Sequence, residues 1–164
     1  GMVLDSRRAG TSEGNEVRLE WANGTGAQVW TLAEPPARIE GEYRIALAMA
    51  PSMFASSAAT GSTLSRSAPG FTVEPDAGSG LYKIKVADGR ALTAVGRAAA
   101  LRDVDGTDSQ LWSLTEADGG YVVGSRSTGM VLDSRRAGTS EGNEVRLEWA
   151  NGTGAQVWEI MKLK

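Results

Sequence analysis

The chain contains one thirty-residue segment twice, without a single difference between the two copies. Residues 1–30 and residues 129–158 both read GMVLDSRRAGTSEGNEVRLEWANGTGAQVW, so the period of the duplication is 128 residues (129 − 1). An old duplication accumulates substitutions, so this one is recent, designed or held in place by selection. It also constrains the fold, because a domain that can accommodate only one copy of this segment must leave the other copy outside.

A weaker period of 39 residues underlies the duplication. The tyrosines Tyr43, Tyr82 and Tyr121 are 39 residues apart (82 − 43 and 121 − 82), and a glycine stands one or two positions before each. Each tyrosine opens a short segment in which apolar residues alternate with others, which predicts a strand. The first of these strands is expected to direct the following side chains to one face: Tyr43, Ile45, Leu47 and Met49.

Three further strand signals follow in the units, and the last of them contains the motif Gln-x-Trp in three places. They lie at residues 53–55, 91–93 and 130–133 for the second strand, at 17–21 and 145–149 for the third, and at 28–30, 110–112 and 156–158 for the fourth. Glycine-rich turns with Asn-Gly and Asp-Gly pairs separate the strands, and such pairs favour tight hairpin turns. Units of about forty residues with four short strands each, three to a closed body, predict an all-β protein with the β-trefoil fold.

The composition excludes several classes of function. The chain has no cysteine and no histidine, which removes disulfides, the usual zinc sites and nucleophiles that depend on histidine. The formal net charge is −3 without a basic stripe, so nucleic acid is not an expected partner. The longest apolar run, around residues 45–53, is interrupted by Pro51 and is too short to span a membrane. No carboxylate pair has a catalytic spacing, so we expect a non-enzymatic protein without a cofactor.

The Gly-x-Tyr starts, the Leu-Asp pair at 132–133 and the Gln-x-Trp ends together resemble the ricin B-chain-like (R-type) β-trefoil lectin family, of which Gln-x-Trp is the hallmark. The resemblance covers nearly the whole chain. It is weakest where residues 71–73, Phe-Thr-Val, replace Gln-x-Trp. It implies trefoil repeats and favours a secreted protein. The expected units are a permuted or swapped partial repeat at 1–34 and full repeats at 41–77, 80–118 and 119–164.

The resemblance implies carbohydrate binding, to a galactose-type or another glycan, in a shallow pocket on a repeat. In this family an Asp after the second strand accepts hydrogen bonds from sugar hydroxyls. An aromatic ring on the third strand stacks on the apolar sugar face, and a polar residue near Gln-x-Trp completes the site. The positions that match are Asp133, Asn151 and Gln156, and in the first copy Asp5, Asn23 and Gln28.

The aromatic position departs from the family pattern. Counting along the third strand puts the stacking position at Glu148, and Trp149 comes one residue later, as does Trp21 in the first copy. Strict alternation sends Trp149 into the core together with Leu147, unless a β-bulge turns it outward. If it points inward, Arg146 and Glu148 face the pocket and the site becomes charged. All four of these polar and aromatic residues are therefore candidates for sugar binding.

The other two repeats match the family's site less well. Thr93 takes the Asp position and Arg102 the aromatic position in repeat 80–118, while Ala55 replaces the Asp in repeat 41–77. Residues 103–108 carry three carboxylates, the kind of ligand that calcium prefers, but they lack the spacing of an EF-hand loop. They also fall where a hairpin turn is expected, so no metal site is predicted.

Two other classes of function remain open. Some β-trefoils inhibit proteases by presenting long loops, and the stretch from Ala50 to Pro69 is expected to be long and irregular. The third class is an assembly module. The surplus copy has unpaired strand edges and apolar side chains, which favours association, most simply a homodimer through the duplicated segment. A tandem array with a 128-residue period, or deliberate design, would also explain the surplus.

Overall fold

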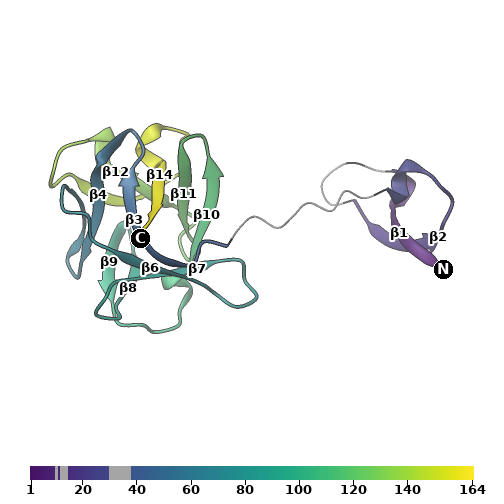
Figure 1. Ribbon diagram of the computed structural model, residues 1–164, viewed down its shortest axis with the longest axis horizontal. Helices are drawn as coiled ribbons and strands as arrows, with labels where there is room; N and C mark the ends of the chain where they lie inside the picture. Colours follow the sequence, from purple (N-terminus) through teal and green to yellow (C-terminus); the bar gives the residue numbers. More distant parts are fainter. Residues whose placement is uncertain (10, 12–14, 30–37) are drawn as a thin grey trace. The chain divides into compact units, whose positions relative to one another are not determined.

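The computed structural model describes residues 1–9, 11, 15–29 and 38–164, and it divides into two units, Gly1–Ala37 and Arg38–Lys164 (Figure 1). Strands and short 3-10 turns make up the described part of both units, which contains no α-helix. No helix in these ranges has the length and apolar character needed to cross a membrane. Each unit is described below by itself.

The unit Arg38–Lys164 consists of three successive sets of four strands. The first set is β3 (Gly41–Leu47), β4 (Ala50–Ala58), β5 (Gly61–Ser65) and β6 (Phe71–Pro75). The second set is β7 (Tyr82–Lys85), β8 (Ala91–Val95), β9 (Ala98–Arg102) and β10 (Trp112–Ala117). The third set is β11 (Gly120–Ser125), β12 (Val131–Ser134), β13 (Glu144–Glu148) and β14 (Trp158–Lys162).

The outer strands of the three sets close into a barrel. The pairings run β3–β6–β7–β10–β11–β14 and return from β14 to β3, so the ring has no free edge. The inner strands form the hairpins β4–β5, β8–β9 and β12–β13, and β13 pairs with both β5 and β9. A barrel of first and fourth strands with three hairpins packed together is the β-trefoil arrangement, and the predicted all-β trefoil fold is confirmed.

The core fills the barrel with the residues that begin or alternate along these strands. Trp112 and Trp158, the last residues of two Gln-x-Trp motifs, are 0% exposed. Each indole Nε1 donates to a carbonyl of the second strand of its own set, to Leu92 O at 2.9 Å and to Leu132 O at 3.1 Å. A buried indole needs such an acceptor for its N–H. Phe71, which starts β6 as the tryptophans start β10 and β14, is also buried.

Three local expectations from the sequence are wrong. Met49 was expected to share one face with Leu47, but β3 ends at Leu47, which is buried, and Met49 is 46% exposed in the following turn. The stretch from Ala50 to Pro69 is not irregular, because β4 and β5 occupy most of it as a hairpin. The glutamines of Gln-x-Trp in the described motifs lie in 3-10 turns, such as η3 (Asp108–Gln110), and the fourth strand begins only at the tryptophan.

The described residues of the unit Gly1–Ala37 form a hairpin. Its elements are β1 (Met2–Ser6), η1 (Arg7–Ala9), β2 (Val17–Trp21) and η2 (Gly26–Gln28). They correspond to β12, η4 (Arg135–Ala137), β13 and η5 (Gly154–Gln156) of the other unit. The register is the same in both hairpins: Asp5 pairs with Arg18 as Asp133 pairs with Arg146.

Candidate functional site

The hairpin β12–β13 and the loop after it bring together the candidate residues of the last repeat. Asp133 lies on β12 opposite Arg146 on β13, because the two strands pair in a regular antiparallel register. Trp149 follows β13 directly, and Asn151 and Gln156 belong to the loop that leads to β14. The described part of the first copy arranges the equivalent residues in the same order: Asp5, Arg18, Glu20, Trp21, Asn23 and Gln28.

Gln156 connects three of these residues through its side-chain amide, which is 2% exposed. Its Nε2 donates to Asp133 Oδ2 at 3.1 Å and to the Trp149 carbonyl at 3.0 Å, and its Oε1 accepts from Asn151 N at 2.9 Å. A buried amide that uses its donors and its acceptor in this way fixes the loop against the strand. The glutamine of Gln-x-Trp therefore supports the carboxylate from behind.

The same bracing recurs in the other two Gln-x-Trp units. Gln28 donates to Asp5 Oδ2 at 3.0 Å. Gln110 donates to Thr93 Oγ1 at 3.2 Å and accepts from Asp105 N at 2.9 Å. Among these three glutamines, the two in the duplicated segment donate to a carboxylate, whereas Gln110 donates to a hydroxyl. This difference in one side chain separates the copied unit from repeat 80–118.

Asp133 is a carboxyl held largely away from water. The residue is 5% exposed, and Gln156 Nε2 donates a hydrogen bond to its Oδ2. Burial raises the pKa of Asp133 above its ordinary value, because loss of hydration disfavours the charged form. The Gln156 hydrogen bond and the Arg146 charge oppose this shift, while Glu148 adds to it.

Raising the pH is expected to reduce the stabilisation that Asp133 gives to the fold. Because its pKa is higher in the folded protein than in the unfolded chain, the folded state holds the proton more tightly between the two values. The contribution is complete below the ordinary pKa of Asp and is lost as the pH rises through the raised pKa. Urea unfolding of the protein and of Asp133→Asn at several pH values measures it. As the pH rises from the ordinary pKa of Asp to the raised pKa of Asp133, the free energy of unfolding of the protein should fall relative to that of Asp133→Asn, and above this range the difference should stay constant. A difference in the free energy of unfolding that does not change with pH would contradict the raised pKa.

Trp149 points to solvent. Alternation along the third strand predicted that it lies in the core beside Leu147, and this is wrong, because Trp149 is 62% exposed. The register of β12 with β13 is regular, so a bulge is not the reason. The strand ends at Glu148, and Glu148 Oε1 accepts a hydrogen bond from Trp149 N at 3.1 Å. The indole edge lies over the turn before β12, where a Cβ added to Gly129 would meet Trp149 Cζ3 at 3.8 Å.

The charges of Arg146 and Glu148 act on the Asp133 carboxyl, and Arg97 contacts Glu148. Arg146 Nη2 donates to Glu148 Oε2 at 2.9 Å, and Arg97 donates to Glu148 Oε1. Buried Nε of Arg146 has no hydrogen-bond partner among the described residues. Arg97 belongs to the turn between β8 and β9 of the neighbouring repeat. Sequence reasoning missed Arg97, because no local signal shows that this turn reaches the last repeat.

The first copy forms a surface hollow with a volume of about 520 Å³ around these positions. Its lining includes three of the candidates for sugar binding, Asp5, Trp21 and Asn23, together with Arg18 and Glu20, the equivalents of Arg146 and Glu148. The carboxylate and the amide offer hydrogen-bonding groups, and the indole, 62% exposed, offers an apolar face. The second copy has the identical residues on a hairpin of the same register.

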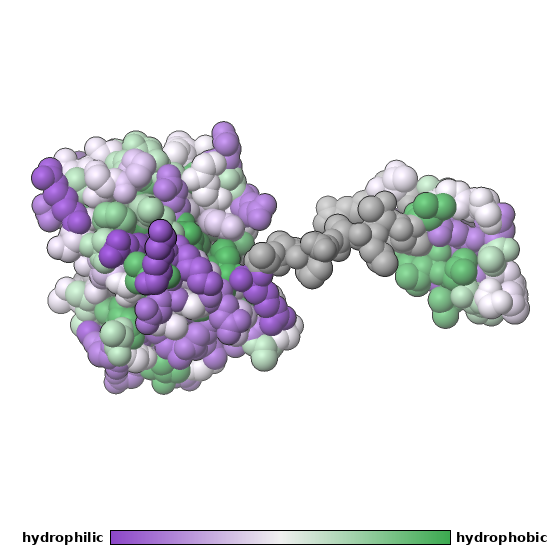
Figure 2. All heavy atoms as spheres, in the orientation of Figure 1, coloured by the Kyte–Doolittle hydropathy of each residue, from purple (hydrophilic) through white to green (hydrophobic). Residues whose placement is uncertain are grey.

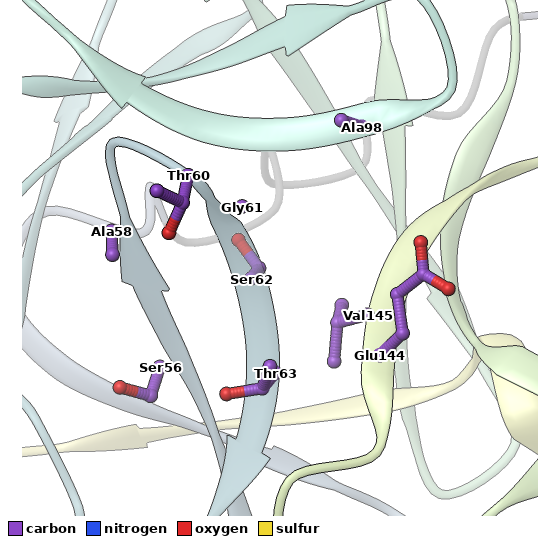
Figure 3. A pocket seen from close by; sticks show the side chains of 9 residues that line it. All are labelled: Ser56, Ala58, Thr60, Gly61, Ser62, Thr63, Ala98, Glu144 and Val145. Carbon is purple, nitrogen blue, oxygen red and sulfur yellow. The ribbon is translucent and has the colours of Figure 1, made fainter.

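A second cavity of about 290 Å³ lies where β4, β5, β9 and β13 meet (Figure 3). Hydroxyl groups dominate its lining: Ser56, Thr60, Ser62 and Thr63. Its carboxylate, Glu144, is paired with Arg135 at 2.7 Å, and none of the lining residues is aromatic. This cavity therefore lacks the combination of carboxylate and exposed ring that the copied segment provides.

The remaining candidate positions serve the fold. Thr93 is buried and donates to Ala91 O at 2.9 Å, and Arg102 donates to Ala59 O at 2.5 Å. In the acidic run 103–108, Asp105 Oδ1 accepts from both the amide and the hydroxyl of Thr107, which closes a turn. Asn151 makes the same turn with Thr153. Among the described residues, no group of three or more His, Cys, Asp or Glu side chains is placed to hold a metal ion.

Comparisons with known proteins agree with this architecture. The model of the family "Ricin-type beta-trefoil lectin domain-like" matches residues 70–148. That range covers the second set of strands and the whole hairpin β12–β13 that carries Asp133. A search of curated proteins found no match.

Several solved structures share the fold at low sequence identity. A mosquitocidal holotoxin is 15% identical with a TM-score of 0.71, and the match covers 76% of this chain but 17% of the toxin. The designed three-fold symmetric protein ThreeFoil is 22% identical with a TM-score of 0.63, over 76% of this chain and 100% of ThreeFoil. Polyporus squamosus lectin, bound to the epitope Neu5Aca2-6Galb1-4GlcNAc, is 18% identical with a TM-score of 0.62, over 75% of this chain and 49% of the lectin.

The chain thus spans about a sixth of the toxin's length and half of the fungal lectin's. Neither the family model nor these structures supports the protease-inhibitor reading or the assembly reading. Together, the Gln-x-Trp bracing, the closed barrel and the family match confirm the resemblance of this chain to the ricin-type β-trefoil lectin family.

Proposed function

We propose that this protein is a non-catalytic carbohydrate-binding module and that the glycan binds in the hollow of the duplicated segment. One observation carries the proposal: an indole that is 62% exposed, Trp149, follows the strand that pairs with the buried and braced carboxyl of Asp133. A pyranose presents hydroxyls on its edge and C–H groups on its face, so it needs both kinds of partner in one place.

Each residue has a separate role in this proposal. Asp133 accepts hydrogen bonds from a pair of hydroxyls, and Trp149 stacks on the C–H face. Asn151 fixes the loop through its bond to Thr153, and Gln156 keeps the carboxylate in position. Arg146 and Glu148 form the polar wall, and Arg97 joins them from the preceding repeat. The equivalents in the first copy form a second site of the same composition except for Arg97, which lies outside the duplicated segment.

Replacing both aspartates by asparagine is expected to weaken glycan binding about tenfold, because hydrogen bonds to a charged acceptor become bonds to a neutral one. Asparagine keeps the shape and the oxygen that accepts from Gln28 or Gln156. A glycan array first identifies a ligand among galactose-terminated and sialylated glycans, and titration then compares the protein with the double variant Asp5→Asn/Asp133→Asn.

Asp105→Asn is the matched control. It makes the same chemical change in repeat 80–118, at a turn where the chain elsewhere uses asparagine. We expect it to leave binding unchanged. The proposal fails if no glycan binds, or if the double variant and the control bind equally well.

A further inference from the structure

The two copies of the duplicated segment adopt the same local structure in two different surroundings. Arg7 pairs with Glu16 at 2.6 Å, as Arg135 pairs with Glu144 at 2.7 Å. The side chain of Asn15 donates to Ser6 Oγ at 2.9 Å, and its counterpart Asn143 does the same to Ser134 at 2.9 Å. Even the unusual backbone recurs, with φ of 54° at Arg8 and 55° at Arg136. In these contacts, all among described residues, the two hairpins agree.

Burial of the apolar face does distinguish them. Leu147 and Val145 are 0% and 2% exposed in the barrel, whereas Leu19 and Val17 are 62% and 49% exposed. Met2 is likewise 54% exposed, against 9% for Met130. Apolar residues are visible on the surface of the unit Gly1–Ala37 (Figure 2). The hydrophobic effect favours covering this face, and the second unit shows which surroundings cover the same residues.

The chain between the first copy and β3 is long enough for the first copy to replace the second copy in the barrel of the same molecule. In the barrel, Ala48 N donates to Val157 O at 3.0 Å, so Val29 in the place of Val157 would lie beside the end of β3. The distance back to Gly41 along the strand is about 23 Å at ~3.3 Å per residue. The twelve steps of chain from Val29 to Gly41 can span up to about 40 Å.

We infer that β1, β2 and η2 compete with β12, β13 and η5 of the same chain for one place in the trefoil. Either copy can close the barrel on the strands between residues 41 and 125, and the other copy is then left outside. The partner of the exposed face of β1–β2 is therefore this chain's own barrel. The inference rests on the duplication and on burial, and it holds whether or not the hollow binds a sugar.

Disulfide trapping tests the exchange directly, because the chain has no cysteine of its own. Thr63 pairs with Glu144 between β5 and β13, and the equivalent of Glu144 in the first copy is Glu16. Opposed residues in antiparallel strands have Cα atoms about 4.5–5.5 Å apart, within the range of a disulfide. A disulfide in Thr63→Cys/Glu144→Cys shows that the second copy occupies the barrel, as in this structure. A disulfide in Thr63→Cys/Glu16→Cys shows that the first copy has taken its place.

Both double variants are oxidised in dilute solution and separated on a non-reducing gel, and the cross-linked peptides are identified by mass spectrometry. We expect a disulfide within the monomer in both. The inference is overturned if the Glu16→Cys variant stays reduced while the Glu144→Cys variant reacts. It is also overturned if the Glu16→Cys disulfide forms only between two chains, which would make the duplicated segment a dimer interface.

The matched substitutions Leu19→Ala and Leu147→Ala give an independent readout. If the copies exchange, each single variant keeps one intact copy and its Tm falls by only a few degrees, while the double variant loses about 10 °C. Thermal unfolding followed by circular dichroism measures all three. If Leu147→Ala alone lowers Tm as much as the double variant does, the first copy does not enter the barrel and the inference fails.

Discussion

Replacing Trp112 by alanine is expected to lower the free energy of unfolding by about 3–5 kcal/mol, the largest stability effect that we anticipate in this protein. Trp112 is 0% exposed, and its indole donates to Leu92 O at 2.9 Å. The substitution removes a large side chain from the core and leaves a buried carbonyl without its donor, and both changes are destabilising. Repeat 80–118 is present once, so no second copy can replace it.

Urea unfolding followed by circular dichroism measures this loss. Trp149→Ala is the control, because the same residue type is 62% exposed there and its removal is expected to cost less than about 1 kcal/mol. Trp112→Phe fills most of the volume but does not donate, so it should fall between the two. Equal stability of the Trp112→Ala and Trp149→Ala variants would show that the tryptophans of Gln-x-Trp do not organise the core.

Removing both exposed tryptophans is expected to weaken glycan binding about 100-fold, because the apolar sugar face loses its only aromatic partner in each proposed site. Trp21 and Trp149 are both 62% exposed, so Trp21→Ala/Trp149→Ala should leave the free energy of unfolding nearly unchanged. Titration with the glycan identified on the array measures the affinity, and circular dichroism confirms the fold of the variant.

The single variants separate the two copies. If each hairpin carries a site, Trp21→Ala and Trp149→Ala each halve the number of glycans bound while the affinity of the remaining site is kept. Val104→Ala, which removes an exposed apolar side chain elsewhere, should have no effect. Unchanged binding by the double tryptophan variant would contradict stacking and leave the charged wall of Arg146 and Glu148 as the candidate contact.

Much of the architecture was predictable because it depends on repetition along the chain. The 39-residue spacing of Tyr43, Tyr82 and Tyr121, together with Gln-x-Trp, predicted the trefoil, which the closed barrel and the family match confirm. The candidate residues on β12 and β13 come together because paired strands bring near positions in the sequence into register. Such features need little information from distant parts of the chain.

Features that depend on where strands end were not predictable. Alternation gave the wrong orientation for Met49 and Trp149, because β3 and β13 stop one or two residues earlier than the pattern does. A strand ends where its pairing partners end, and these partners lie elsewhere in the sequence. For the same reason Arg97 escaped notice, since it meets Glu148 only after two repeats have packed together.

The duplicated segment separates the two kinds of information. Its thirty residues determine the hairpin, the turn at Arg8 or Arg136 and the amide that braces the aspartate, because all of these contacts lie within the segment. They do not determine burial: the same leucine is 62% exposed as Leu19 and 0% exposed as Leu147. The side chains that cover Leu147 come from strands outside this segment. Only the tertiary structure therefore decides which copy has its apolar face buried.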